Sequence, residues 1–158
     1  MNRHLRFLKN TLDALPDEVV IIADNGNIEY ANKAWRDFGE RNHCSVEQWE
    51  GLNYIGVCER AEADGDDSAG KARDAINAVL RDEQGAALLD YPCYVVSQLH
   101  WYRMVVTSFG SADDRYCIIL HRDMTEGDEP ALDWLPYDHG AADQAMGAGA
   151  SGARRLGW

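Results

Sequence analysis

Basic residues are scarce in this chain of 158 residues. Only 12 Arg and 3 Lys stand against 17 Asp and 10 Glu, which gives a formal net charge of −12. Proteins that bind nucleic acid or anionic lipid contact phosphate groups through clustered Lys and Arg. We therefore expect neither nucleic acid nor a membrane as a partner. The length suits one domain, and 46% apolar with 27% charged residues is typical of a globular protein.

The chain also lacks metal-binding, catalytic and targeting motifs. Its four cysteines never occur as Cys-x-x-Cys, which removes the usual zinc and thioredoxin sites, so we predict no metal site. No nucleophile and base stand together in a recognisable motif, so we predict no catalytic residue. No apolar run is longer than Val19–Ala23, whereas a bilayer span requires roughly 20 residues. Residues Met1–Asn10 lack the apolar segment of a signal peptide, which predicts a cytoplasmic protein with reduced thiols.

A stripe of leucines marks the beginning of the chain, at positions Leu5, Leu8, Leu12 and Leu15. Their spacings of three and four predict an amphipathic helix over residues 1–15, which Pro16 ends. The apolar face of this helix can either cover its own domain, including the outer side of the sheet, or pair with a second copy as a dimer interface. Residues 1–10 carry basic but no acidic side chains, so we also expect an electrostatic contact with the acidic domain that follows.

Two short strands and a tight turn come next. Glu18–Ala23 is a β-branched run, and Ile28–Ala31 is its return strand. Asn25 and Gly26 between them form the strongest short hairpin signal, and both are expected at positive φ. Asn32 can then serve as the N-terminal cap of a helix.

The remaining pattern changes from helical to extended. Apolar positions at helical spacing predict a helix over Ala69–Glu83, with Gly85 as its C-terminal cap. After Gly85 the period becomes two, which predicts strands over Leu88–Val96, Leu99–Phe109 and Tyr116–His121.

This order of elements predicts an α+β fold, in which a five-stranded antiparallel sheet carries helices on one face. Residues 16–126 would form that domain. The segment Trp49–Arg60 has a mixed pattern without a clear period. Residues 127–158 contain many Gly and Ala without a sustained period, and we expect them to be a mostly mobile tail.

Several short motifs resemble the PAS domain family, most closely the PAS domains of bacterial sensor kinases. In chain order they are Asp24–Asn32, Gly51–Tyr54, Tyr91–Cys93, Trp101–Val106 and Arg122–Glu126. The last contains Asp-Met-Thr, similar to the Asp-Ile-Thr that closes many PAS domains. The resemblance covers about Leu15–Glu126. It implies a sheet whose concave face encloses a small-ligand pocket with the helices, and a sensory or protein-interaction role, often in a homodimer.

Strand parity selects the side chains that would line such a pocket. Tyr102 and Met104 share one face of their strand, and Ile119 and His121 share one face of the next. With positions from the helices and the preceding strand they would form a mainly apolar pocket with a few polar groups. The ten candidates are Tyr54, Cys58, Ile76, Leu80, Tyr91, Cys93, Tyr102, Met104, Ile119 and His121. The same residues also describe an ordinary filled core.

The sequence leaves the cofactor open, with flavin and haem both disfavoured. In the flavin-binding LOV branch of the PAS family a reactive cysteine follows a Gly-x-Asn stretch, and this sequence has Tyr54 there. His121 stands two residues before Asp123. LOV domains have their flavin-facing glutamine at this position, so the resemblance implies that the imidazole of His121 points inward. Haem-binding PAS domains usually take their iron ligand from a helix beside the pocket, and Ala69–Glu83 contains no histidine.

Three functions compete at this point. The first is a sensory module that binds a small apolar or aromatic molecule in its core and signals through a homodimer, a histidine kinase or another regulator. The second is a ligand-free interaction domain, whose acidic surface or leucine stripe docks a partner. The third, a small α+β enzyme with an Asp or His general base, is disfavoured because no base has an assignable partner. No output domain follows Glu126, so the chain is either a free-standing protein or a truncated sensor.

Overall fold

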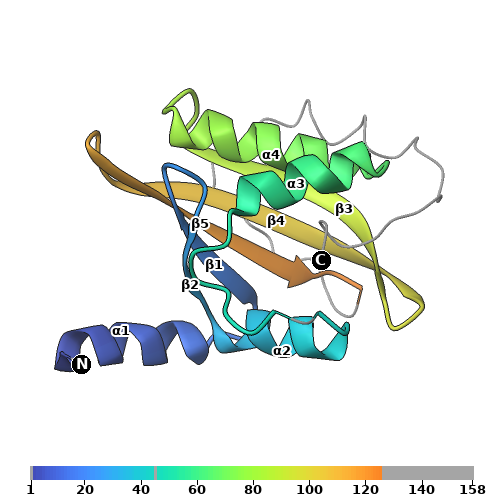
Figure 1. The fold of residues 1–158 in the computed structure, drawn as a ribbon, viewed down its shortest axis with the longest axis horizontal. Helices are drawn as coiled ribbons and strands as arrows, with labels where there is room; N and C mark the ends of the chain where they lie inside the picture. Colours follow the sequence, from blue (N-terminus) through green and yellow to red (C-terminus); the bar gives the residue numbers. More distant parts are fainter. Residues whose placement is uncertain (1, 45, 126–158) are drawn as a thin grey trace.

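The computed structural model describes residues 2–44 and 46–125 (Figure 1). Helix α1 (Arg3–Asp13) precedes strands β1 (Glu18–Ala23) and β2 (Ile28–Ala31). Helices α2 (Lys33–Arg41), α3 (Tyr54–Ala63) and α4 (Asp67–Leu80) follow, and the chain then forms strands β3 (Ala86–Val95), β4 (Gln98–Ser111) and β5 (Asp114–Asp123). The expected tail over residues 127–158 lies outside the described residues. None of the helices in the described ranges is long and apolar enough to cross a membrane.

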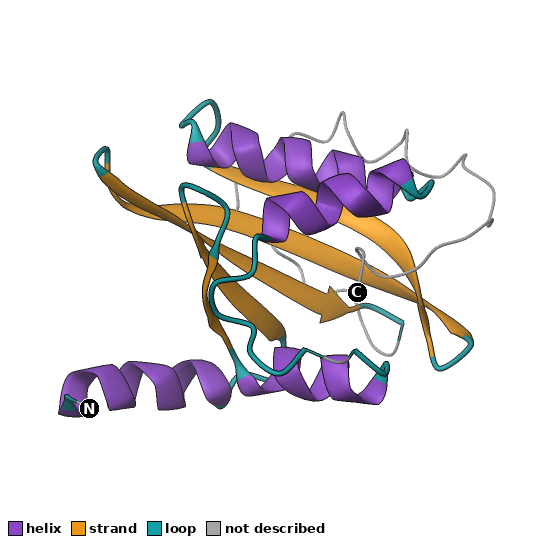
Figure 2. Ribbon diagram, in the orientation of Figure 1, coloured by secondary structure: helices purple, strands orange, loops and turns teal. Residues whose placement is uncertain are grey.

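One antiparallel sheet of five strands has the order β2-β1-β5-β4-β3. The first strand, β1, pairs with the last, β5, so that Glu18 lies opposite His121. Helix α4 packs against β3, β4 and β5, α3 packs against α4, and α2 packs against β1 (Figure 2). The predicted fold class, an α+β domain with a five-stranded antiparallel sheet, is therefore confirmed.

The core lies between the sheet and the helices. On β4 the side chains of Tyr102, Met104 and Val106 are buried, and on β5 those of Cys117, Ile119 and His121 are buried. These alternate positions are the ones that strand parity predicts. The helices supply the opposite wall of the same apolar cluster, with Trp35, Phe38, Tyr54, Cys58, Ala72 and Ile76 among its members. Full burial of one such large side chain is worth about 1.5–3 kcal/mol.

Asn32 connects four segments through one fully buried side chain. Its Oδ1 accepts hydrogen bonds from the N–H groups of Trp35, at 3.0 Å, and Val19, at 2.9 Å. The first of these bonds is the predicted N-terminal cap of α2. Its Nδ2 donates to the carbonyls of Leu12, at 3.0 Å, and Asp17, at 2.9 Å. The amide thus joins the end of α1, the following linker, β1 and α2.

The turn between β1 and β2 differs from the predicted one. Only Gly26 has a positive φ, of 83°, and Asn25 does not. The N–H of Gly26 donates to the carbonyl of Ala23, and the register shifts beside it between Ile21 and Ile22. This is the three-residue alternative, in which a single left-handed residue follows the turn. Glycine is also required for space, because a Cβ at Gly26 would lie 2.8 Å from Cγ1 of Ile55.

The helical middle also differs from the sequence-based boundaries. The segment of mixed pattern contains α3, which Asn53 caps through its Oδ1 and the N–H of Gly56. Helix α4 begins earlier than Ala69, because Asp66 is its cap, and it ends at Leu80. Gly85 is not its C-terminal cap, since Asp82 takes the left-handed conformation after the helix, with a φ of 61°.

Candidate functional site

The ten predicted pocket residues come together in the interior between the sheet and helices α3 and α4. Nine are buried, and only Leu80, the last residue of α4, is half-buried. Eight of them belong to one apolar cluster, and Leu80 packs against it. His121 is the polar member of the set and is 1% exposed.

His121 forms hydrogen bonds with two buried tyrosines, one on each ring nitrogen. The Tyr91 hydroxyl lies 2.6 Å from Nδ1, and the Tyr54 hydroxyl lies 3.1 Å from Nε2. Burial lowers the pKa of His121 to about 3 and raises the pKa of both phenols well above their usual value. The imidazole is therefore neutral, and it donates one hydrogen bond and accepts the other. Tyr54, His121 and Tyr91, here called the Tyr–His–Tyr chain, form a directional polar chain in an apolar core.

Aromatic rings surround this chain. The ring of Trp35 lies 5.5 Å from the His121 ring and 5.8 Å from that of Tyr54. Tyr91 meets His121 edge-on and stacks on Tyr102, at centroid distances of 5.7 and 5.9 Å. Trp35 is not among the predicted site residues. Trp35 lies on the first turn of α2, the helix that Asn32 caps, and this position in the sequence is the signal that would have indicated an inward side chain.

The arrangement of strands, helices and core is that of a known family. A family model described as the PAS fold matches residues 12–129. The chain belongs to the PAS family. PAS domains are generally sensory and signalling modules, and typically they are not catalytic.

Individual relatives of this PAS domain are distant. An uncharacterised 104.1 kDa protein of Rhodobacter capsulatus is 32% identical over 109 residues, which cover 65% of this chain and 11% of that relative. The PAS domain of BvgS from Bordetella pertussis superposes with a TM-score of 0.57 at 16% identity, covering 79% of this chain and 89% of that one. The phage VqmA–DPO complex gives 0.55 at 20% identity, over 77% of this chain and 53% of that one. These structures share the fold.

The buried thiols of Cys58 and Cys117 are poor nucleophiles and poor metal ligands. Burial raises the pKa of Cys58 to about 12 and that of Cys117 to about 11, so both remain protonated near neutral pH. Metal binding requires the thiolate. Within residues 2–44 and 46–125, no three His, Cys, Asp or Glu side chains are grouped so that they could hold a metal ion.

The closing motif of the PAS domain is fastened to β4. The N–H of Met124 donates to the carbonyl of Trp101 at 2.7 Å, and the N–H of Trp101 donates to Oγ1 of Thr125 at 2.9 Å. His100 Nδ1 lies 2.5 Å from Oδ2 of Asp123. Partial burial opposes ionisation of Asp123, but the hydrogen bonds from Thr125 and His100 bring its pKa below the usual value. Met124 and Thr125 are therefore held beside Trp101 of β4.

Helix α1 contacts its own domain through polar groups. The Tyr30 hydroxyl donates to Oδ1 of Asp13 at 2.8 Å, the N–H of Lys33 donates to the same oxygen at 2.7 Å, and Arg36 lies 3.3 Å from it. Partial burial opposes ionisation, yet these partners lower the pKa of Asp13. Lys9 lies over the Tyr30 ring. An electrostatic contact is thus present, but its ion pair has the opposite sense to the expected one, with the acid on α1 and the base on α2.

The apolar side chains near the start of α1 are exposed to solvent. Helix α1 has no buried residue, and Leu5, Phe7 and Leu8 are 46, 67 and 58% exposed. In Figure 1 the helix projects beyond the sheet with α2 as its nearest neighbour. The expectation that α1 covers the outer side of its own sheet is therefore wrong. The helix also ends at Asp13, so Leu15 of the predicted stripe lies beyond it.

We predict that His121 makes the PAS domain less stable in mild acid. Its pKa is about 3 in the folded state and near 6.5 when unfolded, so the unfolded chain binds an extra proton at pH values between the two. Stability is therefore greatest above pH 6.5 and falls by about 2 kcal/mol between pH 6.5 and pH 5. Urea unfolding across this range measures the slope. His121→Gln, which does not titrate, should lose this part of the slope, and equal slopes in the two proteins would contradict the prediction.

Proposed function

We propose that this PAS domain is a sensory module that acts as a homodimer, with the apolar side of α1 as the contact between two copies. A small apolar or aromatic molecule, held in the core beside the Tyr–His–Tyr chain, would be the signal. A ligand that prefers one arrangement of the sheet and flanking helices biases the domain toward it. A histidine kinase or another regulator would then respond to that bias.

The observation that carries the dimer is the direction of α1. Its polar residues Lys9 and Asp13 bind the domain, whereas the apolar side chains of Leu5 and Leu8, closer to the start of the helix, are exposed to solvent. Isolated helices of this length are marginally stable in water. A second copy of α1, packed along the same residues, would cover this side and stabilise the helix. Within one copy, the described residues leave Leu5 and Leu8 exposed.

The Tyr–His–Tyr chain supports the ligand part of the proposal. Buried polar groups cost stability unless they are hydrogen-bonded, so a fully bonded polar chain in an apolar core favours a specific arrangement over simple packing. The chain joins α3, β3 and β5, since Tyr54, Tyr91 and His121 come one from each. A ligand with one polar group could replace either phenol at the imidazole. Such an exchange would alter the contact between a helix and the sheet.

A thermal-shift screen of the full chain tests the ligand. Small aromatic and heteroaromatic compounds that carry one hydrogen-bonding group are the probes. A compound present at 100 times its Kd should stabilise the folded state by about 2.7 kcal/mol, and hence raise the Tm by about 5 °C or more.

Two variants locate the binding of any such compound. Met104→Phe adds volume to the core and should abolish the shift, whereas Lys71→Ala on the exposed side of α4 should retain it. If no compound raises the Tm, or if Met104→Phe responds like the unmodified protein, the core is not a ligand site. The domain would then be an interaction module that acts through its surface alone.

A further inference from the structure

The lengths of the two hydrogen bonds at the His121 ring indicate which nitrogen carries the proton. The Tyr91 hydroxyl lies 2.6 Å from Nδ1, and the Tyr54 hydroxyl lies 3.1 Å from Nε2. Hydroxyl donors form shorter hydrogen bonds than N–H donors, with usual lengths of about 2.7 Å and about 2.9 Å. The shorter bond therefore has the Tyr91 hydroxyl as its donor, and the longer bond has the Nε2–H group as its donor.

The surroundings of Tyr91 lead to the same tautomer. Its side chain is buried, and among the residues that the structure describes its hydroxyl bonds only to His121. If Nδ1 carried the proton, this hydroxyl would accept the bond, and its own hydrogen would be buried without an acceptor, which is costly. With the proton on Nε2, the hydroxyl donates to Nδ1 and is satisfied. His121 therefore presents an N–H group to α3.

Tyr54 is the phenol that a ligand can replace more easily. Tyr91 belongs to β3, which pairs with β4 along its whole length, and its ring stacks on that of Tyr102. Tyr54 is the first residue of α3, which packs against α4 rather than pairing within the sheet. Its bond to the imidazole is also the longer of the two. A ligand group in its place meets the Nε2–H of His121.

We propose that the ligand of the PAS core carries a hydrogen-bond acceptor, a carbonyl oxygen or an aromatic ring nitrogen, in the place of the Tyr54 hydroxyl. This inference rests on the proposed function and narrows its ligands to one chemical class. A ring whose only polar group is a donor would require the proton on Nδ1 of His121. The hydrogen of the Tyr91 hydroxyl would then lose its acceptor, so Tyr91 sets the ligand class through the imidazole.

Nitrogen NMR of the unmodified full chain tests the tautomer before any ligand is added. We expect the signals of a protonated Nε2 and an unprotonated Nδ1 for His121. His121→Gln, which lacks both signals, assigns them. A proton on Nδ1 would overturn the inference about the ligand class and would leave the proposed ligand-binding function standing.

Tyr54→Ala tests the ligand class directly, because it opens a space of about one ring beside Nε2 of His121. Pyridine, whose nitrogen accepts a hydrogen bond, and pyrrole, whose N–H donates one, are single-ring probes that are uncharged near neutral pH. Titration calorimetry should give pyridine a Kd at least about tenfold lower than that of pyrrole. Tyr54→Ala/Tyr91→Phe removes the bond that fixes the tautomer, and there the preference should fall below about threefold. Equal or tighter binding of pyrrole to Tyr54→Ala would overturn the inference.

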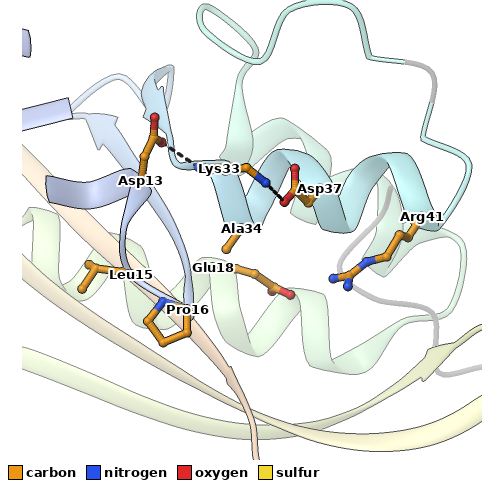
Figure 3. Close-up of a pocket in the computed structure, with 8 residues that line it drawn as sticks. All are labelled: Asp13, Leu15, Pro16, Glu18, Lys33, Ala34, Asp37 and Arg41. Atoms are coloured by element: carbon orange, nitrogen blue, oxygen red, sulfur yellow. Dashed lines mark hydrogen bonds and ion pairs between the residues drawn. The ribbon is translucent and has the colours of Figure 1, made fainter. Parts of the chain in front are cut away.

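A cavity outside the core is the other place where a small ring could bind. It has a volume of about 300 Å³ and lies where the linker after α1 meets α2, with Leu15, Pro16 and Ala34 among its lining residues (Figure 3). None of the ten core residues lines it. Adding Ala34→Leu to Tyr54→Ala narrows this cavity and should leave the Kd of pyridine unchanged. A weaker pyridine complex in that variant would place the binding here and overturn the proposal.

The thermal-shift screen of the unmodified chain provides a test that does not depend on the folding of Tyr54→Ala. Every compound that raises the Tm is expected to carry an acceptor. Stabilisation by pyrrole or indole, whose only polar group is a donor, would overturn the inference alone. If no compound raises the Tm, the proposed ligand-binding function fails, and this inference fails with it.

Discussion

Replacing Asn32 with alanine is expected to lower the free energy of unfolding by about 4 kcal/mol. The substitution removes the cap of α2 and leaves the N–H of Val19 and the carbonyls of Leu12 and Asp17 without their bonds to this amide. The Leu12 carbonyl keeps a hydrogen bond from the N–H of Leu15, at 3.2 Å, so the N–H of Val19 and the carbonyl of Asp17 are the groups that lose a partner. Each buried group left without a partner costs about 1–3 kcal/mol, and the lost cap adds about 1 kcal/mol. Thermal unfolding should show this as a fall in Tm of about 10–15 °C.

Two further variants give this prediction its controls. Asn32→Asp keeps an oxygen for Val19 and Trp35 but places a second oxygen against two carbonyls, so it should destabilise nearly as much as alanine. Asn77→Ala, on a half-buried position of α4, should change stability by less than about 0.5 kcal/mol. A loss below about 1 kcal/mol in Asn32→Ala would mean that the four bonds do not hold these segments together.

Replacing Leu8 with glutamate is expected to weaken the proposed dimer about a thousandfold. A two-fold interface contains each residue twice, so one substitution removes two buried leucines and adds two charges. Each leucine contributes about 2 kcal/mol when buried, and 4 kcal/mol corresponds to about three powers of ten in Kd. Sedimentation velocity over a concentration series measures the change.

Asn10→Glu is the matched control for this variant. It makes the same change in charge on the same helix, but away from the apolar side, and it should alter the Kd by less than about threefold. Equal weakening by both variants would indicate a general effect of charge. An unchanged Kd in Leu8→Glu would show that the copies meet elsewhere or not at all.

The sequence predicted those features of the fold that depend on local pattern. The period of two placed Met104 and Ile119 on the inner face, and the capping preference of Asn32 placed the start of α2. It did not assign α3, because the residues from Tyr54 to Ala63 have no clear apolar period. That helix is held by its Asn53 cap and by packing on α4, and a single sequence does not reveal such packing.

The sequence predicted which residues lie together in the interior, but not which hydrogen bonds join them. Parity and resemblance both placed His121 in the interior, yet its partners Tyr54 and Tyr91 lie 67 and 30 residues away. Which phenol meets which ring nitrogen depends on how α3 and β3 approach β5. Three of the four hydrogen bonds of the Asn32 side chain were not predicted for the same reason, because they depend on how distant segments pack together. For α1 the sequence left two partners open, and in the structure its polar contacts with Tyr30, Asn32 and Arg36 set its direction.

The mass of the unmodified full chain in solution tests the central claim most directly. Light scattering after size exclusion should be recorded at about 100 µM, where a dimer of micromolar affinity is fully formed. One chain has a mass of 17.7 kDa. We predict a peak at twice this mass, which shifts toward 17.7 kDa as the protein is diluted. A single peak at 17.7 kDa throughout the concentration series would contradict a dimer through α1, and with it the proposed route of signalling.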